Sequence, residues 1–531
     1  APAPAAATTA LAPTVAGLTP IRGPLTGGTK LTVVGSRFTA ASTVLIGGVK
    51  AARVTYVSPT TLTAVTPARA TAGKVPVKVL NGDTTSAVTA NSYFTYVKPG
   101  GTTTTPTPPS IVKTVPGTIP VTGGLLSLAG TGFTWVTAAA IDGAPAPYKV
   151  ESSTALRVTA PPPVDPSTTT RTLTLTGAGG ATATTTLTAA PVPTPATAAP
   201  LIGLTDRNGA TYDPATDTTD PRLIGSITID IPWATTEPDP TQPLVLDTIT
   251  AKIEQAQAAG IDVRLRLPTA RTAPTWALTL TGTVPWRDTH LGTIVTYTIG
   301  RWWTPTYAAL YQSYQARLAA ALGDYPAVKE VTVSQCATIY AEPFMRQSGI
   351  PNGTTIKTTN YSYLDDLDCL YRSIDTTSAA WPNQRVTLAT NPFQGFTPPA
   401  ADRKMLDTIG VIDYCRGTLG DRCVLGNNSL RASTTNTMVC PDGTVLPASD
   451  QQGGYDDLYC HLHALGRPTM YQTARGAAIG NPMDTIAKAH AYGATDIELN
   501  TDYPTYDQTV LAGWRDTFIQ SWNTQGSPRQ K

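Results

Sequence analysis

Polar side chains that could bind or process a sugar follow the strand-like segments of the chain beyond residue 200. These residues are Trp233 and Glu237, Arg266, Glu342, Asn391, Asn427 and Asn428, Gln472, Glu498, Asn500 and Asp502. Amides and carboxylates bind hydroxyl groups, and Trp rings such as those of Trp233 and Trp303 stack on pyranose rings. The set is typical of a carbohydrate site, although each Trp could equally serve in core packing.

The segments that would position these side chains alternate between strand and helix patterns. Strands are expected at 201–204, 226–231, 261–267, 330–334, 385–390, 422–425, 468–472 and 495–499. Helices are expected at Leu246–Gly260 and from Pro305 to Gly323, with Thr304 as the N-cap. Eight such units predict a parallel (β/α)8 barrel, whose active site lies at the carboxyl ends of the strands. The polar residues would then share one rim.

Two segments before residue 200 are copies of one another. Residues 18–38 and 113–133 both carry Thr-Gly-Gly and Gly-x-x-Phe, at Thr26 and Gly35 in the first copy and at Thr122 and Gly130 in the second. Short alternating strands and Gly turns follow in each copy, over about 85 residues, which predicts two small antiparallel sandwiches. Neither copy holds paired carboxylates or a His cluster, so we expect no active site there.

These two copies resemble the IPT/TIG family of immunoglobulin-like domains, which are commonly spacers or adhesive modules in secreted proteins. The predicted division of the chain is a tail at 1–12, sandwiches at 13–97 and 110–188, linkers at 98–109 and 189–200, a barrel at 201–525 and a tail at 526–531. The expected fold class is therefore multidomain: two all-β immunoglobulin-like sandwiches and an α/β TIM-type barrel.

The barrel region resembles clan A of the glycoside hydrolases. The resemblance lies in IPWATTEPDP at Ile231–Pro240, in the helix and strand that begin at RWWTP, and in AEP at Ala341–Pro343. It implies that Glu342 is the general acid/base. Two residues depart from the family pattern, because Ala341 replaces an Asn and Gln472 stands where a nucleophilic Glu is expected.

An amide is neutral and a poor nucleophile, so Gln472 does not support a covalent intermediate. Glu498, at the end of the eighth strand, offers an alternative, since an inverting pair needs only a general acid and a general base with a water between them. We therefore expect Glu342 as acid and Glu498 as base. In the alternative interpretation, each Glu only binds a hydroxyl group or forms a structural ion pair.

The cysteines indicate an oxidising compartment. All six lie beyond residue 330, without a CxxC motif: Cys336, Cys369, Cys415, Cys423, Cys440 and Cys460. We expect disulfides, with 415–423, 440–460 and 336–369 as one of several possible pairings. Disulfides imply a secreted, extracellular or cell-surface protein, and the opening APAPAAATTA is typical of a mature chain whose signal peptide has been removed.

Several functional classes lack a sequence signal. Basic residues before residue 200 are dispersed, which argues against nucleic-acid binding, and no apolar run is long enough to span a membrane. His461 and His463 are two residues apart and would lie on different sides of a helix, so we expect no metal and no cofactor.

Two hypotheses remain for the function. The first is a secreted carbohydrate-active protein that acts on or binds an extracellular polysaccharide or cell-surface glycan. The second is a non-catalytic structural protein, an adhesin or a filament subunit, with a degenerate barrel. Ala1–Pro13 has no large apolar residue before Leu11. An extended strand added to a neighbouring sandwich would order this tail and build a homo-oligomer or filament, although it could also pack on its own sandwich.

Overall fold

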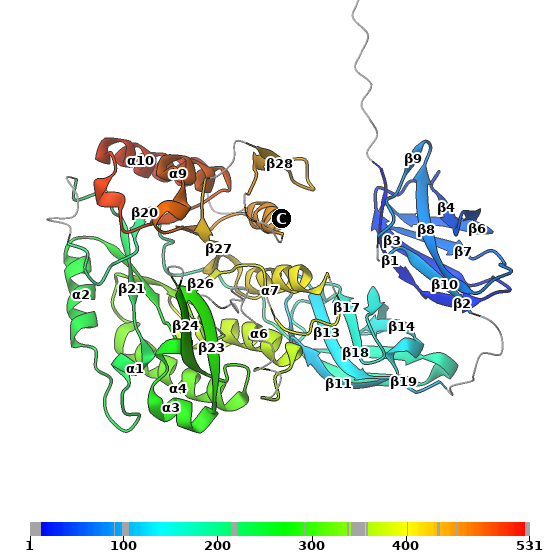
Figure 1. Cartoon of the computed structure of the whole chain (residues 1–531), viewed down its shortest axis with the longest axis horizontal. Coiled ribbons are helices and arrows are strands. Elements are labelled where there is room, and N and C mark those ends of the chain that lie inside the picture. The colour runs from blue at the N-terminus through cyan, green and yellow to red at the C-terminus, as the bar shows by residue number, and fades with distance from the viewer. Residues whose placement is uncertain are drawn as a thin grey trace, which may run out of the picture. The chain divides into compact units, whose positions relative to one another are not determined.

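The computed structural model describes residues 12–89, 91–97, 106–213, 220–290, 293–336, 339–340, 343, 356, 359–393, 395–400, 402–432, 436–449, 451 and 454–525. The N-terminal tail, Ala341 and Glu342 lie outside the described residues. Two β-sandwiches and a barrel make up the described part of the chain (Figure 1).

The first sandwich packs two sheets around a core of small apolar side chains. One sheet has the order β1-β3-β7-β6, and the main path of the other is β2-β10-β8-β4-β5, with β9 paired to β8. The strands are β1 Thr14–Thr19, β2 Arg22–Pro24, β3 Lys30–Ser36, β4 Thr43–Ile46, β5 Val49–Lys50, β6 Arg53–Ser58, β7 Thr61–Val65, β8 Gly73–Asn81, β9 Thr84–Thr85 and β10 Tyr93–Val97. Leu31, Val33 and Val77 are among its fully buried residues.

The second sandwich repeats this topology, except that no described strand corresponds to β9. Its sheets have the orders β11-β13-β17-β16 and β12-β19-β18-β14-β15. The strands are β11 Ser110–Val115, β12 Thr118–Ile119, β13 Gly124–Thr131, β14 Val136–Ile141, β15 Ala144–Pro145, β16 Tyr148–Val150, β17 Ala155–Ala160, β18 Thr170–Gly177 and β19 Thr182–Ala189. The predicted pair of sandwiches is confirmed.

The repeated Gly-x-x-Phe motif has a steric cause. A Cβ atom at Gly35 would lie 1.9 Å from the carbonyl oxygen of Thr14. At Gly130 the same distance, 1.9 Å, would separate a Cβ atom from the carbonyl oxygen of Ser110. Only glycine lets the first strand of each sandwich approach its neighbour this closely.

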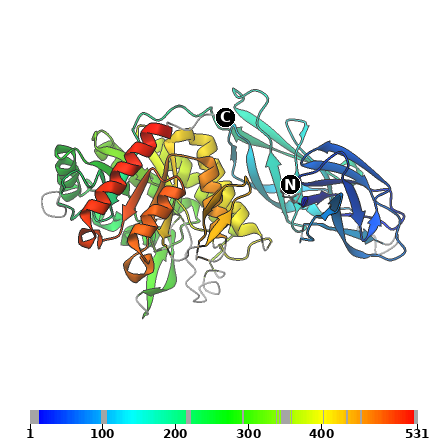
Figure 2. The same ribbon diagram turned by 90° about the horizontal axis from the view of Figure 1, so that it is seen from above.

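The predicted barrel is confirmed as a closed, parallel ring of eight strands in the order β20-β21-β22-β25-β26-β27-β30-β31. These strands are β20 Gly203–Asp206, β21 Ser226–Asp230, β22 Asp262–Arg266, β25 Val328–Thr332, β26 Arg385–Ala389, β27 Cys423–Leu430, β30 Thr469–Thr473 and β31 Asp496–Leu499. Helices surround the ring, as the two perpendicular views show (Figures 1 and 2).

The helices follow the strands in the expected alternation. They are α1 Trp233–Thr236, α2 Asp247–Ala258, α3 Thr275–Thr281, α4 Pro305–Leu322, α6 Tyr363–Ala380, α7 Arg403–Leu419, α8 Tyr455–Leu465, α9 Pro482–Ala491 and α10 Gln508–Gln525. The hydroxyl of Thr304 accepts from the backbone N–H of Tyr307, so the predicted N-cap of α4 is confirmed. No helix among the described residues is long and apolar enough to cross a bilayer.

Two hairpins interrupt the alternation, and the sequence patterns did not identify them. The strands β23 Thr283–His290 and β24 Thr293–Gly300 pair antiparallel between α3 and α4. The strands β28 Thr437–Val439 and β29 Val445–Pro447 pair antiparallel between β27 and α8.

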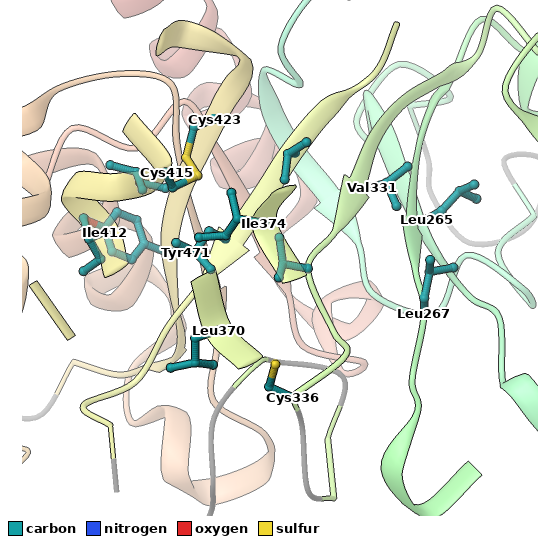
Figure 3. Close-up of a cluster of buried hydrophobic side chains, with 14 of the residues drawn as sticks. Leu265, Leu267, Val331, Cys336, Leu370, Ile374, Ile412, Cys415, Cys423 and Tyr471 are labelled. Carbon is teal, nitrogen blue, oxygen red and sulfur yellow. A yellow bond between two sulfur atoms is a disulfide. The ribbon is translucent and has the colours of Figure 1, made fainter. Parts of the chain in front are cut away.

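The apolar core of the barrel region lies between the strands and the helices. Leu265 of β22 and Val331 of β25 belong to it, as do Leu370 and Ile374 of α6 (Figure 3). Disulfides join Cys336 to Cys369, Cys415 to Cys423 and Cys440 to Cys460. The predicted pairing is therefore confirmed.

Candidate functional site

The side chains that point into the barrel are largely polar, since alternate residues of each strand face inward. In the layer nearer the amino ends, Arg264 is fully buried between two carboxylates. Its guanidinium donates to Glu330 Oε2 at 2.8 Å and to Asp496 Oδ2 at 3.0 Å. The hydroxyls of Thr387 and Thr205 donate to Glu330 and Asp496 at 2.8 and 3.0 Å. This layer is a closed ion-pair network.

The next layer, nearer the carboxyl ends of the strands, is centred on Glu498. Its Oε1 accepts from Gln472 Nε2 at 2.7 Å and from Arg207 Nε at 3.3 Å. Its Oε2 accepts from Thr228 Oγ1 at 3.1 Å and from Arg266 Nη2. The carboxylate is completely buried, so both of its oxygens are occupied and neither contacts solvent.

The protonation of Glu498 follows from its neighbours. Burial by itself would raise the pKa of this carboxyl group, but the charges of Arg266, Arg207 and Arg264 lower the pKa to about 2. The pKa of Asp496 shifts in the opposite direction. Burial and the nearby charge of Glu330 raise this pKa, despite the ion pair with Arg264. Glu498 is therefore ionised at any physiological pH, and it is a weak base.

A small hollow lies at the carboxyl ends of the strands, with room for about one water molecule. Its lining residues are Arg266, Thr332, Val333, Pro343, Ala389, Asn428 and Met470. Arg266 and Asn428 are 7% and 5% exposed. The surface of the hollow is mostly apolar, although three of its lining residues, Arg266, Thr332 and Asn428, carry polar groups.

The structure brings three of the predicted site residues together. Arg266, Gln472 and Glu498 meet at one carboxylate, and Arg266 also reaches Asp230 at 3.3 Å. The side chains of Gln472 and Glu498, from the seventh and eighth strands, are therefore in direct contact, and their part in binding or catalysis stays a prediction. Glu342, the predicted acid, lies outside the described residues.

Asn391 and Asn427 lie together but on the outer side of the barrel. The amide of Asn427 donates to the Asn391 side chain at 3.0 Å and accepts from the hydroxyl of Tyr459 on α8 at 2.9 Å. Tyr455, also on α8, donates to Asn391 at 2.8 Å. Both amides are occupied by these bonds between strand and helix.

The two predicted stacking residues are buried among other rings. Trp233 is fully buried and stacks on Tyr314, with Trp276 and Tyr307 at its edges. Its indole N–H donates to Glu237. Trp303 packs against Trp302 and Tyr361 and is 3% exposed. Neither ring presents a face to solvent in this structure.

The last two predicted residues follow the eighth strand. Asn500 is buried and accepts from the hydroxyl of Tyr506 at 2.7 Å, whereas Asp502 is exposed. Their predicted part in ligand binding stays a prediction.

Residues that the sequence reasoning missed complete the site. Arg207, Arg264, Thr228 and Thr332 point inward and were not selected. A signal was present, because Arg264 and Arg266 alternate with apolar residues in a strand that should be buried on both faces. Arginine at alternate positions of such a strand indicates a charged barrel interior.

Comparison with known proteins identifies the first sandwich. A family model described as "IPT/TIG domain" matches residues 13–96. Residues 13–96 are an IPT/TIG domain. The second sandwich shares the topology, and the barrel completes the predicted architecture. A comparison with curated proteins found no match.

Several solved structures are similar to parts of the chain. A Bacteroides ovatus GH5 xyloglucanase in complex with a XXXG heptasaccharide is 11% identical, with 77% of this chain and 99% of that chain covered and a TM-score of 0.33. SGBP-B from a complex xyloglucan utilization locus in Bacteroides uniformis is 19% identical, with 38% and 58% covered and a TM-score of 0.17. The plexin A4 extracellular region is 21% identical, with 29% of this chain and 13% of that chain covered and a TM-score of 0.16.

Proposed function

We propose that this protein is an extracellular carbohydrate-binding protein whose barrel holds a glycan at the carboxyl ends of its strands without hydrolysing it through Glu498. The observation that carries the proposal is that both oxygens of Glu498 already accept hydrogen bonds from the protein, beside a rim where Arg266 and Asn428 lie. The three disulfides support a location outside the cytoplasm. The two sandwiches would serve as spacers for the barrel.

The contacts of Glu498 argue against a role as general base. A general base must hold a water molecule within hydrogen-bond reach and take its proton. Glu498 has no exposed surface, its oxygens already accept from Arg207, Arg266 and Gln472, and its pKa lies near 2. An inverting pair with Glu342 would therefore lack its basic partner.

The residues around the hollow support binding of a sugar at this end of the barrel. Arg266, Thr332 and Asn428 carry groups that can orient a polyol, and Met470 and Ala389 carry apolar groups that can contact the C–H groups of a ring. The resemblance of residues 201–525 to clan A of the glycoside hydrolases supports the same ligand class.

A glycan array with the full-length protein tests the proposal. We expect the wild type to bind a subset of polysaccharides, and Asn428→Ala to lose about tenfold in affinity, because one buried amide contact is removed. Asn523→Ala on the exposed surface of α10 is the matched control and should bind as the wild type does. Absence of binding to every glycan would overturn the proposal and favour the structural alternative.

A further inference from the structure

The outer face of one sheet of the first sandwich gathers basic residues that are dispersed in the sequence. This sheet has the order β2-β10-β8-β4-β5, with β8 at its centre (Figure 1). Val75, Val77 and Val79 of β8 are buried in the core of the sandwich. Because successive residues of a strand face opposite sides, Lys74 and Lys78 lie on the outer face of the sheet.

Cross-strand pairs place a second lysine beside Lys78. Lys78 lies opposite Leu45 of β4, and Leu45 in turn lies opposite Lys50 of β5. Residues that lie directly opposite one another in a sheet share a face. Since neighbouring strands are about 4.8 Å apart, the backbone positions of Lys78 and Lys50 are separated by about 10 Å.

A second row of the same face runs through Lys74. Lys74 lies opposite Thr95 of β10, and Thr95 lies opposite Arg22 of β2. This row also spans two strand spacings, or about 10 Å, and Lys74 and Lys78 are about 13 Å apart along β8. We call the four corners of this arrangement the cationic face: Arg22, Lys50, Lys74 and Lys78.

The cationic face has no acidic neighbour among the described residues of its sheet. Residues 13–97 contain eight Lys and Arg residues and one acidic residue, Asp83, so the formal charge of this sandwich is +7, against +2 for the whole chain. The five strands contain no Asp or Glu. None of the four cations forms an ion pair with a described residue, and Arg22, Lys50 and Lys74 are exposed. Their charges are therefore available to an anionic partner.

The second sandwich shows that the fold does not require these cations. Its strands β18 and β14 occupy the places of β8 and β4, with the buried pair Ile141 and Leu173 where the first sandwich has Ile46 and Val77. Counted from these pairs, the matching outer positions are uncharged: Thr170, Thr174 and Pro145 stand where the first sandwich has Lys74, Lys78 and Lys50. Charge on this face is thus a property of the first sandwich and not of the shared fold, which indicates a binding role.

The geometry of the face favours an extended polyanion. Four separated cations on a sheet can contact several anionic groups of one chain, and an ammonium group donates to an anionic oxygen without a fixed geometry. Lys74 Nζ lies over the ring of Tyr93 at 4.4 Å, so this ring is covered by a cation and is a poor platform for a nucleic-acid base. The described part of the sandwich also has no helix to enter a DNA groove. An acidic polysaccharide fits these features better than a nucleic acid does.

We propose that the cationic face binds a linear acidic polysaccharide, whose carboxylates pair with the four cations. The first sandwich then serves as a glycan-attachment module in addition to its role as a spacer. This inference does not depend on a ligand in the barrel, since the two sites share no residue.

Polymers that are matched in backbone and differ in charge provide the test. Binding of the full-length protein to polygalacturonate and to alginate is compared with binding to their carboxyl-reduced, neutral forms by biolayer interferometry, at low and at high NaCl. At low salt we expect at least one acidic polymer to bind about tenfold or more tightly than its reduced form. This preference should shrink at high salt, because salt screens exposed charges.

A charge-matched pair of variants locates the binding. Lys74→Gln with Lys78→Gln removes two positive charges from the cationic face and should weaken binding of the acidic polymers about tenfold. Lys30→Gln with Arg53→Gln removes two exposed positive charges from the other sheet, where both residues lie opposite Val65, and should change the affinity less than about twofold. Circular dichroism and the melting temperature would establish that both variants are folded. If the first does not fold, Arg22→Gln with Lys50→Gln makes the same comparison.

Three results would overturn the inference. These are equal affinity for acidic and neutral polymers, equal losses in the two charge variants, and tighter binding of DNA that the substitutions on the cationic face abolish. Asn428→Ala separates the inference from the proposed barrel function, because this variant should bind the acidic polymers as the wild type does. If Asn428→Ala weakens that binding and the substitutions on the cationic face do not, the polysaccharide lies at the barrel and only the proposed barrel function stands.

Discussion

The Glu498→Gln variant should destabilise the barrel strongly, although glutamine has almost the same shape. The carboxylate is the counter-charge for Arg207, Arg264 and Arg266, and all of these side chains are buried. The amide would also place an N–H donor where a carboxylate oxygen of Glu498 now accepts a hydrogen bond from Arg266 or Arg207. The variant would leave the buried guanidinium of Arg207 without its carboxylate partner, whereas Arg264 keeps Glu330 and Asp496, and Arg266 keeps Asp230. The loss of a buried partner typically costs about 3–5 kcal/mol.

The pKa of Glu498 gives an independent magnitude. A change from 4.5 in the unfolded chain to about 2 in the folded protein corresponds to about 3 kcal/mol of stabilisation. The folded-state value is depressed, so this stabilisation is complete above pH 4.5 and is lost as the pH falls toward 2. At pH 3 less than half of this stabilisation should remain.

Calorimetry of wild type and variant from pH 7 to pH 3 is the assay. For a barrel of roughly 325 residues, a loss of 3–5 kcal/mol lowers the melting temperature by about 4–7 °C. The difference should shrink as the pH falls below 4.5. Glu254→Gln, on the exposed side of α2, is the control and should change little. A variant that melts within 1 °C of the wild type at pH 7, or above it, would refute the reasoning.

Three further predictions concern steric fit, titration and cross-links. Gly35→Ala and Gly130→Ala should each destabilise their sandwich by about 1–3 kcal/mol, measured by urea unfolding, because the added Cβ meets a carbonyl oxygen. Burial raises the pKa of Asp366 to about 6, so the wild type should gain stability relative to Asp366→Asn as the pH falls from 7 to 4; a difference in melting temperature that does not change with pH would contradict this. Replacing Cys336 and Cys369 together by Ala should cost about 3–4 kcal/mol by thermal unfolding, since the disulfide spans 33 residues.

The barrel was predictable because the same pattern, a short strand followed by a helix, recurs along the chain. Each strand is short and bounded by Gly, Pro or polar residues, and α4 carries Thr304 and Pro305 at its start. The disulfide pairing was also within reach, since four of the six cysteines pair with a near neighbour in sequence.

The direction of individual side chains was harder to predict. Asn427 and Asn428 are adjacent, yet one points to α8 and the other into the hollow, because successive residues of a strand face opposite sides. A sequence does not reveal which of the two faces inward unless the strand register is known. The burial of Trp233 depends on Tyr307 and Tyr314, which lie on a helix some 70 to 80 residues further along the chain. The residues next to Trp233 in the sequence do not predict this contact.

The central claim is that the barrel binds a glycan and that Glu498 does not serve in its hydrolysis. The most direct test incubates the protein with polysaccharides that it binds and measures bound polymer and released reducing ends in the same samples. Wild type, Glu342→Gln and Asn428→Ala are compared. We predict binding by the wild type, weaker binding by Asn428→Ala and no reducing ends above the background of Glu342→Gln. Release of reducing ends by the wild type that disappears in Glu342→Gln would contradict this account.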